Sequence, residues 1–170
     1  MTTGAYYKTS FIGQPSDVVK DDDTGMVVAF PRTFTHKHTY GKLSPFFRGL
    51  SEGRLLATKC VNPECDTEGL WLPPRADCPD CNQPMEWQEI PQPVIGKIYT
   101  YARVEYAGAG IELQTPYYQI DVELPGVCTM FKGYLAEGVA RIGMKVKAEF
   151  RTADPSNTIL DISWVPYDEA

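Results

Sequence analysis

The residues best suited to chemistry in this chain are four cysteines that form two close pairs. Cys60 pairs with Cys65, Cys78 pairs with Cys81, and twelve residues separate the two pairs. Two tight turns that each supply two thiolates can surround one zinc ion tetrahedrally. The spacing therefore predicts a Zn²⁺ site at these four cysteines. Because sulfur would fill every coordination position, the ion would have a structural role and would leave no position open for substrate.

The two turns differ in how well their sequences suit a metal knuckle. In the second turn, Pro79 presets one backbone dihedral and Asn82 tolerates the left-handed conformation that often follows a last ligand. The first turn is expanded, because four residues separate its cysteines instead of two. We expect a less regular geometry there.

Two other chemistries are open to these cysteines. Two disulfides are one, but five cysteines without a secretory segment favour a reducing compartment in which thiolates stay free for a metal. Thiol exchange at Cys78 and Cys81 is the other, and no βαβ pattern precedes that pair to support it. Zinc is the preferred interpretation.

The remaining reactive side chains do not form a catalytic pattern. The chain's only histidines, His36 and His38, flank one lysine and are expected in a solvated loop. Cys128 falls in a predicted strand, where we expect a buried thiol that packs as a small hydrophobe. We therefore predict no catalytic residue in this chain.

Composition narrows the class of protein. The chain has 170 residues, 43% of them hydrophobic and 22% charged, which is typical of a soluble globular protein. No apolar run is long enough to span a bilayer and no basic targeting segment is present, so we expect a cytoplasmic protein without a membrane partner. The net charge is −6, so the chain lacks the excess of lysine and arginine that neutralises nucleic-acid phosphates, which argues against a nucleic-acid partner.

The first half of the sequence predicts an arm followed by a zinc ribbon. Residues 1–43 read as an arm, with the acidic run Asp21–Asp23 and a strand-like patch from Met26 to Phe30 that ends at Pro31. Residues 44–92 read as a helix plus the ribbon. Ser44 is a good N-cap, Pro45 follows it, and Gly53 is placed to end the helix, while residues 55–59 and 85–87 are expected as the ribbon's strands.

Residues 93–170 predict a β domain. Apolar and polar residues alternate with a period of two over residues 96–106, 118–124, 127–135, 144–150 and 160–164. Five such strands with a long first one favour a five-stranded OB-fold barrel, so the whole chain should be mainly β. The small residues at 107–110 are expected to form a mobile loop after the first strand.

Several segments in this order resemble a known family. They are Phe46–Leu55, Leu72–Arg75 ahead of Cys78–Cys81, Glu86–Trp87 and Arg141–Val146. Over about residues 44–166, the chain is similar to acyl-CoA-associated proteins that join a rubredoxin-like zinc ribbon to an OB fold. Residues 1–43 look like an addition to that pattern, and the expanded first turn departs from the family's usual two-residue spacing.

The resemblance implies a noncatalytic accessory subunit. Such proteins occur with thiolases, thiolase-like aldolases or hydroxymethylglutaryl-CoA synthase, where they bridge subunits and help to form the acyl-CoA channel. It implies a thiolase-fold partner in a hetero-oligomer and CoA or acyl-CoA as ligand of the complex. Candidate CoA contacts are Arg54, Lys59 and Arg75 near the ribbon, and Gly108 and Gly110 in the mobile loop. A nucleic-acid-binding protein and an independent acyl-CoA carrier or hydrolase are the alternatives.

Overall fold

The computed structural model describes residues 16–30, 34–108 and 110–168. Two compact units make up the chain, Met1–His38 and Thr39–Ala170. Pro31, which was expected to end the first strand-like patch, and Ala109 of the small-residue loop lie outside the described residues.

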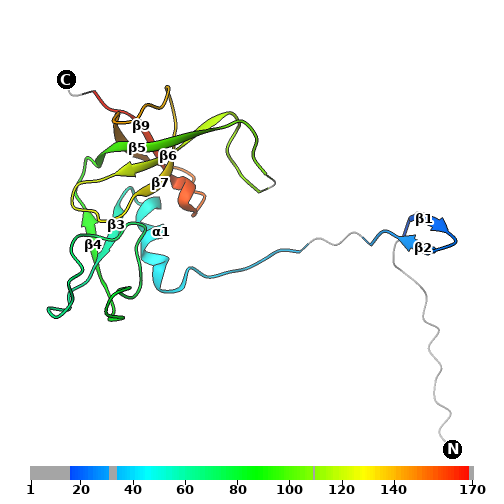
Figure 1. The fold of residues 1–170 in the computed structure, drawn as a ribbon, viewed down its shortest axis with the longest axis horizontal. Helices are drawn as coiled ribbons and strands as arrows, with labels where there is room; N and C mark the ends of the chain where they lie inside the picture. Colours follow the sequence, from blue (N-terminus) through cyan, green and yellow to red (C-terminus); the bar gives the residue numbers. More distant parts are fainter. Residues whose placement is uncertain (1–15, 31–33, 109, 169–170) are drawn as a thin grey trace, which may run out of the picture. The chain divides into compact units, whose positions relative to one another are not determined.

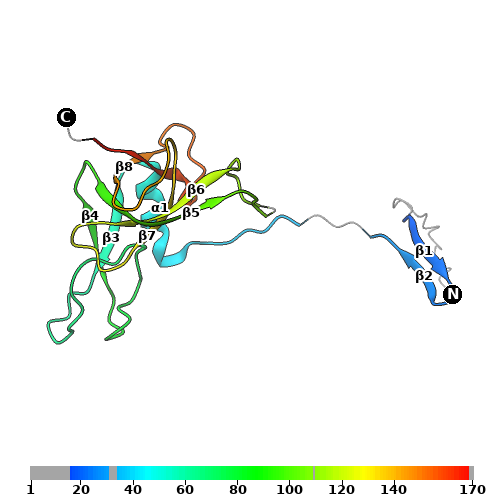
Figure 2. The same ribbon diagram turned by 45° about the horizontal axis from the view of Figure 1, so that its top comes forward.

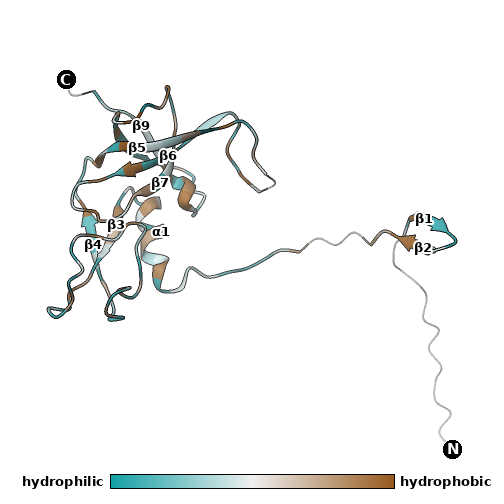
Figure 3. Ribbon diagram, in the orientation of Figure 1, coloured by the Kyte–Doolittle hydropathy of each residue, from teal (hydrophilic) through white to brown (hydrophobic). Residues whose placement is uncertain are grey.

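The first unit contains a two-stranded hairpin. Strands β1 (Val18–Asp22) and β2 (Gly25–Val28) pair antiparallel, and the acidic run leads into the turn between them, where the Thr24 backbone N–H donates to Asp22 Oδ1 at 2.8 Å. Figure 3 shows that apolar residues are concentrated on β2. None of the described residues from 16 to 38 is buried. The hairpin therefore has no core of its own.

The second unit begins with a short helix. A 3₁₀ turn, η1 (Gly41–Leu43), leads into α1 (Ser44–Ser51), which buries Phe46 and Leu50. Leu43 occupies the N-cap instead of Ser44, because the Ser44 hydroxyl donates to the Gly41 carbonyl at 2.7 Å and continues the preceding turn. No helix among the described ranges is long and apolar enough to cross a membrane.

The ribbon is built on one antiparallel ladder. Strand β3 (Leu55–Lys59) pairs with β4 (Glu86–Ile90), with Leu55 opposite Ile90. The long β3–β4 connection, which carries both cysteine pairs, extends from one end of this ladder as two loops (Figure 1). Trp71 pairs with the other edge of β3 through two backbone hydrogen bonds with Thr58, of 2.8 and 3.1 Å. Residues 70 and 71 thus form isolated bridges and no regular strand.

Five strands, of which β5, β6, β7 and β8 are labelled in Figure 2, close into a barrel with the order β5-β6-β7-β9-β8. This is the strand order of an OB-like Greek-key barrel, so the predicted mainly β fold with one short helix and a five-stranded barrel is confirmed. The strands are β5 (Ile95–Val104), β6 (Tyr117–Glu123), β7 (Phe131–Leu135), β8 (Lys145–Phe150) and β9 (Ile162–Pro166). A short 3₁₀ helix, η2 (Ile159–Asp161), precedes β9.

Helix, ribbon and barrel share one hydrophobic core. Phe46, Leu55 and Leu72 belong to the same buried cluster as Phe131 and Trp164 of the barrel. Backbone hydrogen bonds also connect the ribbon to the barrel. The Leu70 N–H donates to the Gly126 carbonyl at 2.8 Å, and the Cys128 N–H donates to the Leu70 carbonyl at 2.9 Å. The ribbon and the barrel therefore pack against each other through a continuous core.

Candidate functional site

The structure brings the four paired cysteines together into one cluster. Their Sγ atoms all lie within 4.8 Å of one another, with Cys60 and Cys81 3.6 Å apart and Cys65 and Cys78 3.8 Å apart. A tetrahedral ion with metal–sulfur bonds of about 2.3 Å has sulfur–sulfur edges of about 3.8 Å. These separations also exceed the disulfide bond length of about 2.05 Å. The cluster therefore has the donors and the size to hold one metal ion.

Local turns hold the sulfurs in place. In the second knuckle, the Asn82 N–H donates to the Cys78 carbonyl at 2.8 Å, and Asn82 has φ of 59°, the left-handed conformation that its sequence position suggests. In the expanded first knuckle, Asn62 Oδ1 accepts from the Glu64 N–H at 3.1 Å, and the backbone carbonyl of Asn62 accepts from the Cys65 N–H at 3.1 Å. Asn62 thus organises the longer first turn as an Asx turn.

The electrostatics of the cluster favour a bound cation. The pKa of Cys78 is lowered to about 6, first of all by its side-chain contact with the Thr67 hydroxyl. The pKa of Cys60 rises to about 12: a backbone hydrogen bond at Asn62 acts to lower it, but burial and the neighbouring sulfurs of Cys78, Cys81 and Cys65 outweigh that bond. Thiolates this close repel one another, so ionising the whole set requires a positive charge between them.

Thr67 is a functional candidate that sequence reasoning missed. Its hydroxyl oxygen lies 3.2 Å from Cys65 Sγ and 3.4 Å from Cys78 Sγ, and it donates to the carboxylate of Asp80. It therefore touches one sulfur from each knuckle. Its position two residues after Cys65 gives no recognisable sequence signal, because its contacts to Cys78 and Asp80 form only where the two turns meet.

Apolar side chains cover one side of the cluster. Met85 and Trp71 pack against Cys60 and Cys78. The Arg75 guanidinium lies 5.1 Å from the centre of the Trp71 ring, within the range of a cation–π contact. This packing places the positive charge of Arg75 near the four-cysteine cluster.

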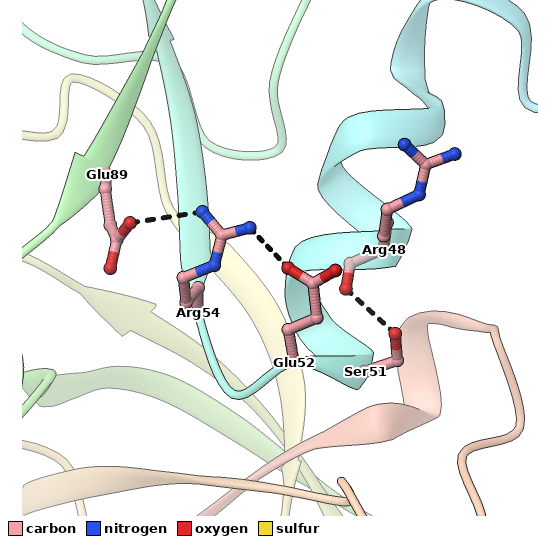
Figure 4. A network of polar contacts seen from close by, with 5 residues as sticks. All are labelled: Arg48, Ser51, Glu52, Arg54 and Glu89. Atoms are coloured by element: carbon pink, nitrogen blue, oxygen red, sulfur yellow. Dashed lines mark hydrogen bonds and ion pairs between the residues drawn. The ribbon is translucent and has the colours of Figure 1, made fainter.

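Two carboxylates hold Arg54, the first of the candidate CoA contacts. Its guanidinium forms an ion pair with Glu52 and another, at 3.3 Å, with Glu89 on β4 (Figure 4). The hydrogen bond to Glu52, followed by the bond to Glu89, raises the pKa of Arg54. A phosphate group would have to compete with both carboxylates for this side chain.

The other candidate contacts lie in two places. Lys59 ends β3, and the Arg75 N–H donates to the hydroxyl of the adjacent Thr58 at 2.9 Å, so these two residues lie at the end of the ribbon that carries the cysteine cluster. Gly108 and Gly110 lie in the β5–β6 loop of the barrel, where Gly110 has φ of +89° and lines a cleft. Arg54 precedes β3 at its opposite end, so the three basic residues do not form one patch.

Cys128 is exposed, which corrects the expectation of a buried thiol. It follows the β6 strand in a loop that bonds to the ribbon, and its S–H donates to the Leu70 carbonyl at 3.2 Å. Partial burial of the sulfur raises the pKa of Cys128, which keeps it protonated and poorly nucleophilic. The histidines His36 and His38 are exposed and lie in the first unit, whereas the four clustered cysteines belong to the second.

Comparisons with known proteins support one family. No protein-family model matches the sequence. A DUF35 domain-containing scaffold protein from Methanocaldococcus jannaschii is 34% identical over 100 residues, which cover 57% of this chain and 67% of that protein.

Two solved structures are similar. The "Ltp2-ChsH2(DUF35) aldolase" matches with a TM-score of 0.57 at 26% identity, over 77% of this chain and 98% of that one. A protein from the DUF35 family of Sulfolobus solfataricus matches with a TM-score of 0.54 at 22% identity, over 76% of this chain and 87% of that one. The second likeness concerns the fold alone.

Proposed function

Because this chain belongs to the DUF35 family, we propose that it is a noncatalytic accessory subunit of a thiolase-type acyl-CoA enzyme complex. The observation that carries the proposal is the likeness to a scaffold protein by sequence and to a DUF35 chain of an aldolase by structure. Catalysis belongs to a thiolase-fold partner, and this chain assembles with it and helps to form the channel for the acyl-CoA. The working location is the cytoplasm.

The metal of the cysteine cluster is zinc. Four thiolates and sulfur–sulfur distances of 3.6 and 3.8 Å suit the tetrahedral coordination of Zn²⁺. With Cys60, Cys65, Cys78 and Cys81 as ligands, the ion has no free position and stabilises the ribbon only. The ribbon in turn shares its core with the barrel, so zinc helps to present one rigid body to the partner.

Contacts with CoA come from the ribbon's metal-bearing end and from the β5–β6 loop. Lys59 and Arg75 supply positive charge for the CoA phosphates, and Gly108 and Gly110 allow the loop to move as substrate enters. Arg54 contributes only if phosphate displaces Glu52 or Glu89. Benzoylsuccinyl-CoA thiolase of anaerobic toluene degradation is the first complex of this type to test.

Reconstitution tests the function. A thiolase-fold candidate partner is expressed with and without this chain, and CoA-dependent cleavage of a 3-oxoacyl-CoA is measured together with complex formation on size exclusion. We expect a stable complex, turnover that depends on this chain, and no turnover by this chain alone. Equal turnover in both preparations without a complex rejects the proposal.

The same preparations separate the alternatives. Hydrolysis of acyl-CoA by the isolated chain would identify an independent hydrolase. Binding of single-stranded DNA that weakens steeply with salt would identify a nucleic-acid-binding protein.

A further inference from the structure

The outer surface of the barrel carries a cleft of about 430 Å³. Its floor is formed by β6 and β7, and its sides by the β5–β6 loop and the segment before β9. In an OB-like barrel these are the second and third strands and the loops after the first and fourth, where ligands of this fold bind. The cleft exceeds the space that holds benzene, about 150 Å³, and falls in the range of small-molecule sites.

The walls of the cleft are largely apolar. Its aliphatic and aromatic lining is Ile111, Leu113, Tyr117, Tyr134, Ile159 and Leu160. Two of these side chains are well exposed to solvent, Ile111 at 52% and Ile159 at 39%. Covering them with an apolar group would remove that surface from water, which is favourable in proportion to the area buried.

The polar groups of the cleft do not select for a polyanion. Among the described residues that line the cleft, Lys132 is the only basic one, and its Nζ is already 2.9 Å from Asp121 Oδ1. Glu112 adds a negative charge to the same lining. Gln119 supplies a neutral amide that makes no hydrogen bond to another described residue and is suited to a carbonyl. Nucleic acid and the phosphates of CoA are therefore poor ligands for this cleft, whereas a neutral apolar group with a carbonyl suits it.

One wall is fixed before a ligand arrives. The buried Asp161 carboxylate accepts hydrogen bonds of 2.7 Å from the Ser156 N–H, the Ser156 hydroxyl and the Asn157 N–H. Tyr134 on β7 donates to the Leu160 carbonyl at 3.4 Å and ties this wall to the floor. The opposite wall is the loop with Gly108 and Gly110, where an added Cβ would meet no atom within 4 Å. A firm wall facing an open glycine loop suits a site that admits groups of different shape.

We infer that this barrel cleft binds the apolar acyl group of the acyl-CoA, as a ring or short hydrocarbon chain, and leaves the CoA nucleotide outside. The inference rests on the proposed function and makes it more specific. It states that this chain binds the acyl group of the substrate.

The test measures binding of benzoyl-CoA, octanoyl-CoA and free CoA to the full zinc-loaded chain by calorimetry. We expect both thioesters to bind at least tenfold more tightly than CoA, since the acyl group is the part that enters the cleft.

Ile159→Glu and, separately, Ile111→Glu should abolish the preference for thioesters, because each places a negative charge on one wall of the cleft. Ile142→Glu is the matched control: this isoleucine is 72% exposed in the β7–β8 loop outside the cleft, and its substitution should leave the preference within twofold. Zinc content and circular dichroism check the fold of each variant.

Several outcomes overturn the inference. They are an equal affinity for CoA and its thioesters, a preference that survives both wall substitutions, and competition by an oligothymidylate for the same site. If Ile159→Glu instead prevents assembly with the thiolase-like partner, the cleft is a protein-docking surface. A chain that shows no acyl preference but still forms the active complex refutes this inference alone and leaves the accessory function standing.

Discussion

Thr67 connects the two cysteine knuckles through a single hydroxyl. Replacing it with valine removes the polar contacts to Cys65, Cys78 and Asp80 while keeping the branched shape. Groups that orient metal ligands typically change metal affinity by about 10- to 100-fold when they are lost. We expect Thr67→Val to bind zinc about tenfold more weakly, measured by competition with a chromogenic chelator.

Thr67→Ser is the control for that measurement. Serine keeps the hydroxyl and loses only a methyl group, so its zinc affinity should stay close to that of the unmodified chain. Equal weakening in both variants would mean that packing of the methyl group matters and that the hydroxyl does not.

The five cysteines provide a direct comparison between a ligand and a non-ligand. Cys78 is buried in the cluster, whereas Cys128 is exposed and donates to a backbone carbonyl. Cys78→Ser should release the metal, which contributes on the order of 10 kcal/mol in small zinc domains, and should unfold the ribbon loops. Cys128→Ser should retain one zinc per chain. Elemental analysis with circular dichroism checks both, and full zinc in the Cys78 variant would refute the ligand assignment.

Cysteine spacing predicted which side chains gather, but not what surrounds them. The two turns are local, so residue types at fixed offsets were enough to bring Cys60, Cys65, Cys78 and Cys81 into one prediction. Thr67 contacts Asp80 thirteen positions away, and that contact depends on how the two turns meet. The exposure of Cys128 has the same origin, because it follows from a loop that leaves the barrel to bond with the ribbon.

At the scale of elements, two strands come close only where glycine allows it. A Cβ on Gly133 of β7 would lie 2.8 Å from Trp164 Nε1 and 2.9 Å from its Cδ1, and this tryptophan on β9 is fully buried. Gly133→Ala should therefore destabilise the barrel by about 1–3 kcal/mol, the usual cost of overpacking. Gly108→Ala is the matched substitution, since nothing lies within 4 Å of its added Cβ.

Chemical denaturation measures both glycine variants. The expected result is a lower midpoint for Gly133→Ala and an almost unchanged midpoint for Gly108→Ala. Equal midpoints would show that Trp164 can shift without cost and that β7 and β9 do not require the glycine.

Alternation of apolar and polar residues identified all five barrel strands, because one face of each strand is buried. It did not identify the loss of regular structure around Trp71 and Leu72. That segment has strand-like composition but bonds to β3 on one side and to residues 126–129 on the other through isolated bridges and side-chain contacts. Such pairings join distant parts of the chain, so no local pattern records them. The barrel cleft escaped prediction for the same reason, since four separate segments line it.

At the scale of the whole molecule, the compact unit begins within the stretch that reads as an arm. Tyr40 stacks on Phe47 of α1 with ring centroids 3.6 Å apart, and its hydroxyl donates to the Asn157 carbonyl at 2.9 Å. Residues before Thr39 belong to the other unit, and none of its described side chains is buried. Among the residues of that unit that the structure describes, the large exposed apolar ones are Val18, Val19, Met26, Val27, Phe30 and Phe34.

Two truncations locate this boundary experimentally. A chain that begins at Thr39 loses no described buried side chain, so its denaturation midpoint and zinc content should match those of the full chain. A chain that begins at Ser44 also loses Tyr40, and with it an aromatic stack and a hydrogen bond that fasten α1 and the segment before β9. We expect this second chain to be about 1–3 kcal/mol less stable, from the usual magnitudes of an aromatic pair and a hydrogen bond. Urea denaturation of both chains makes the comparison.

A loss of stability already present in the Thr39 chain would show that the hairpin unit supports the ribbon and barrel. Equal stability of both truncations would mean that the Tyr40 contacts contribute nothing, and that residues 1–43 act as one arm.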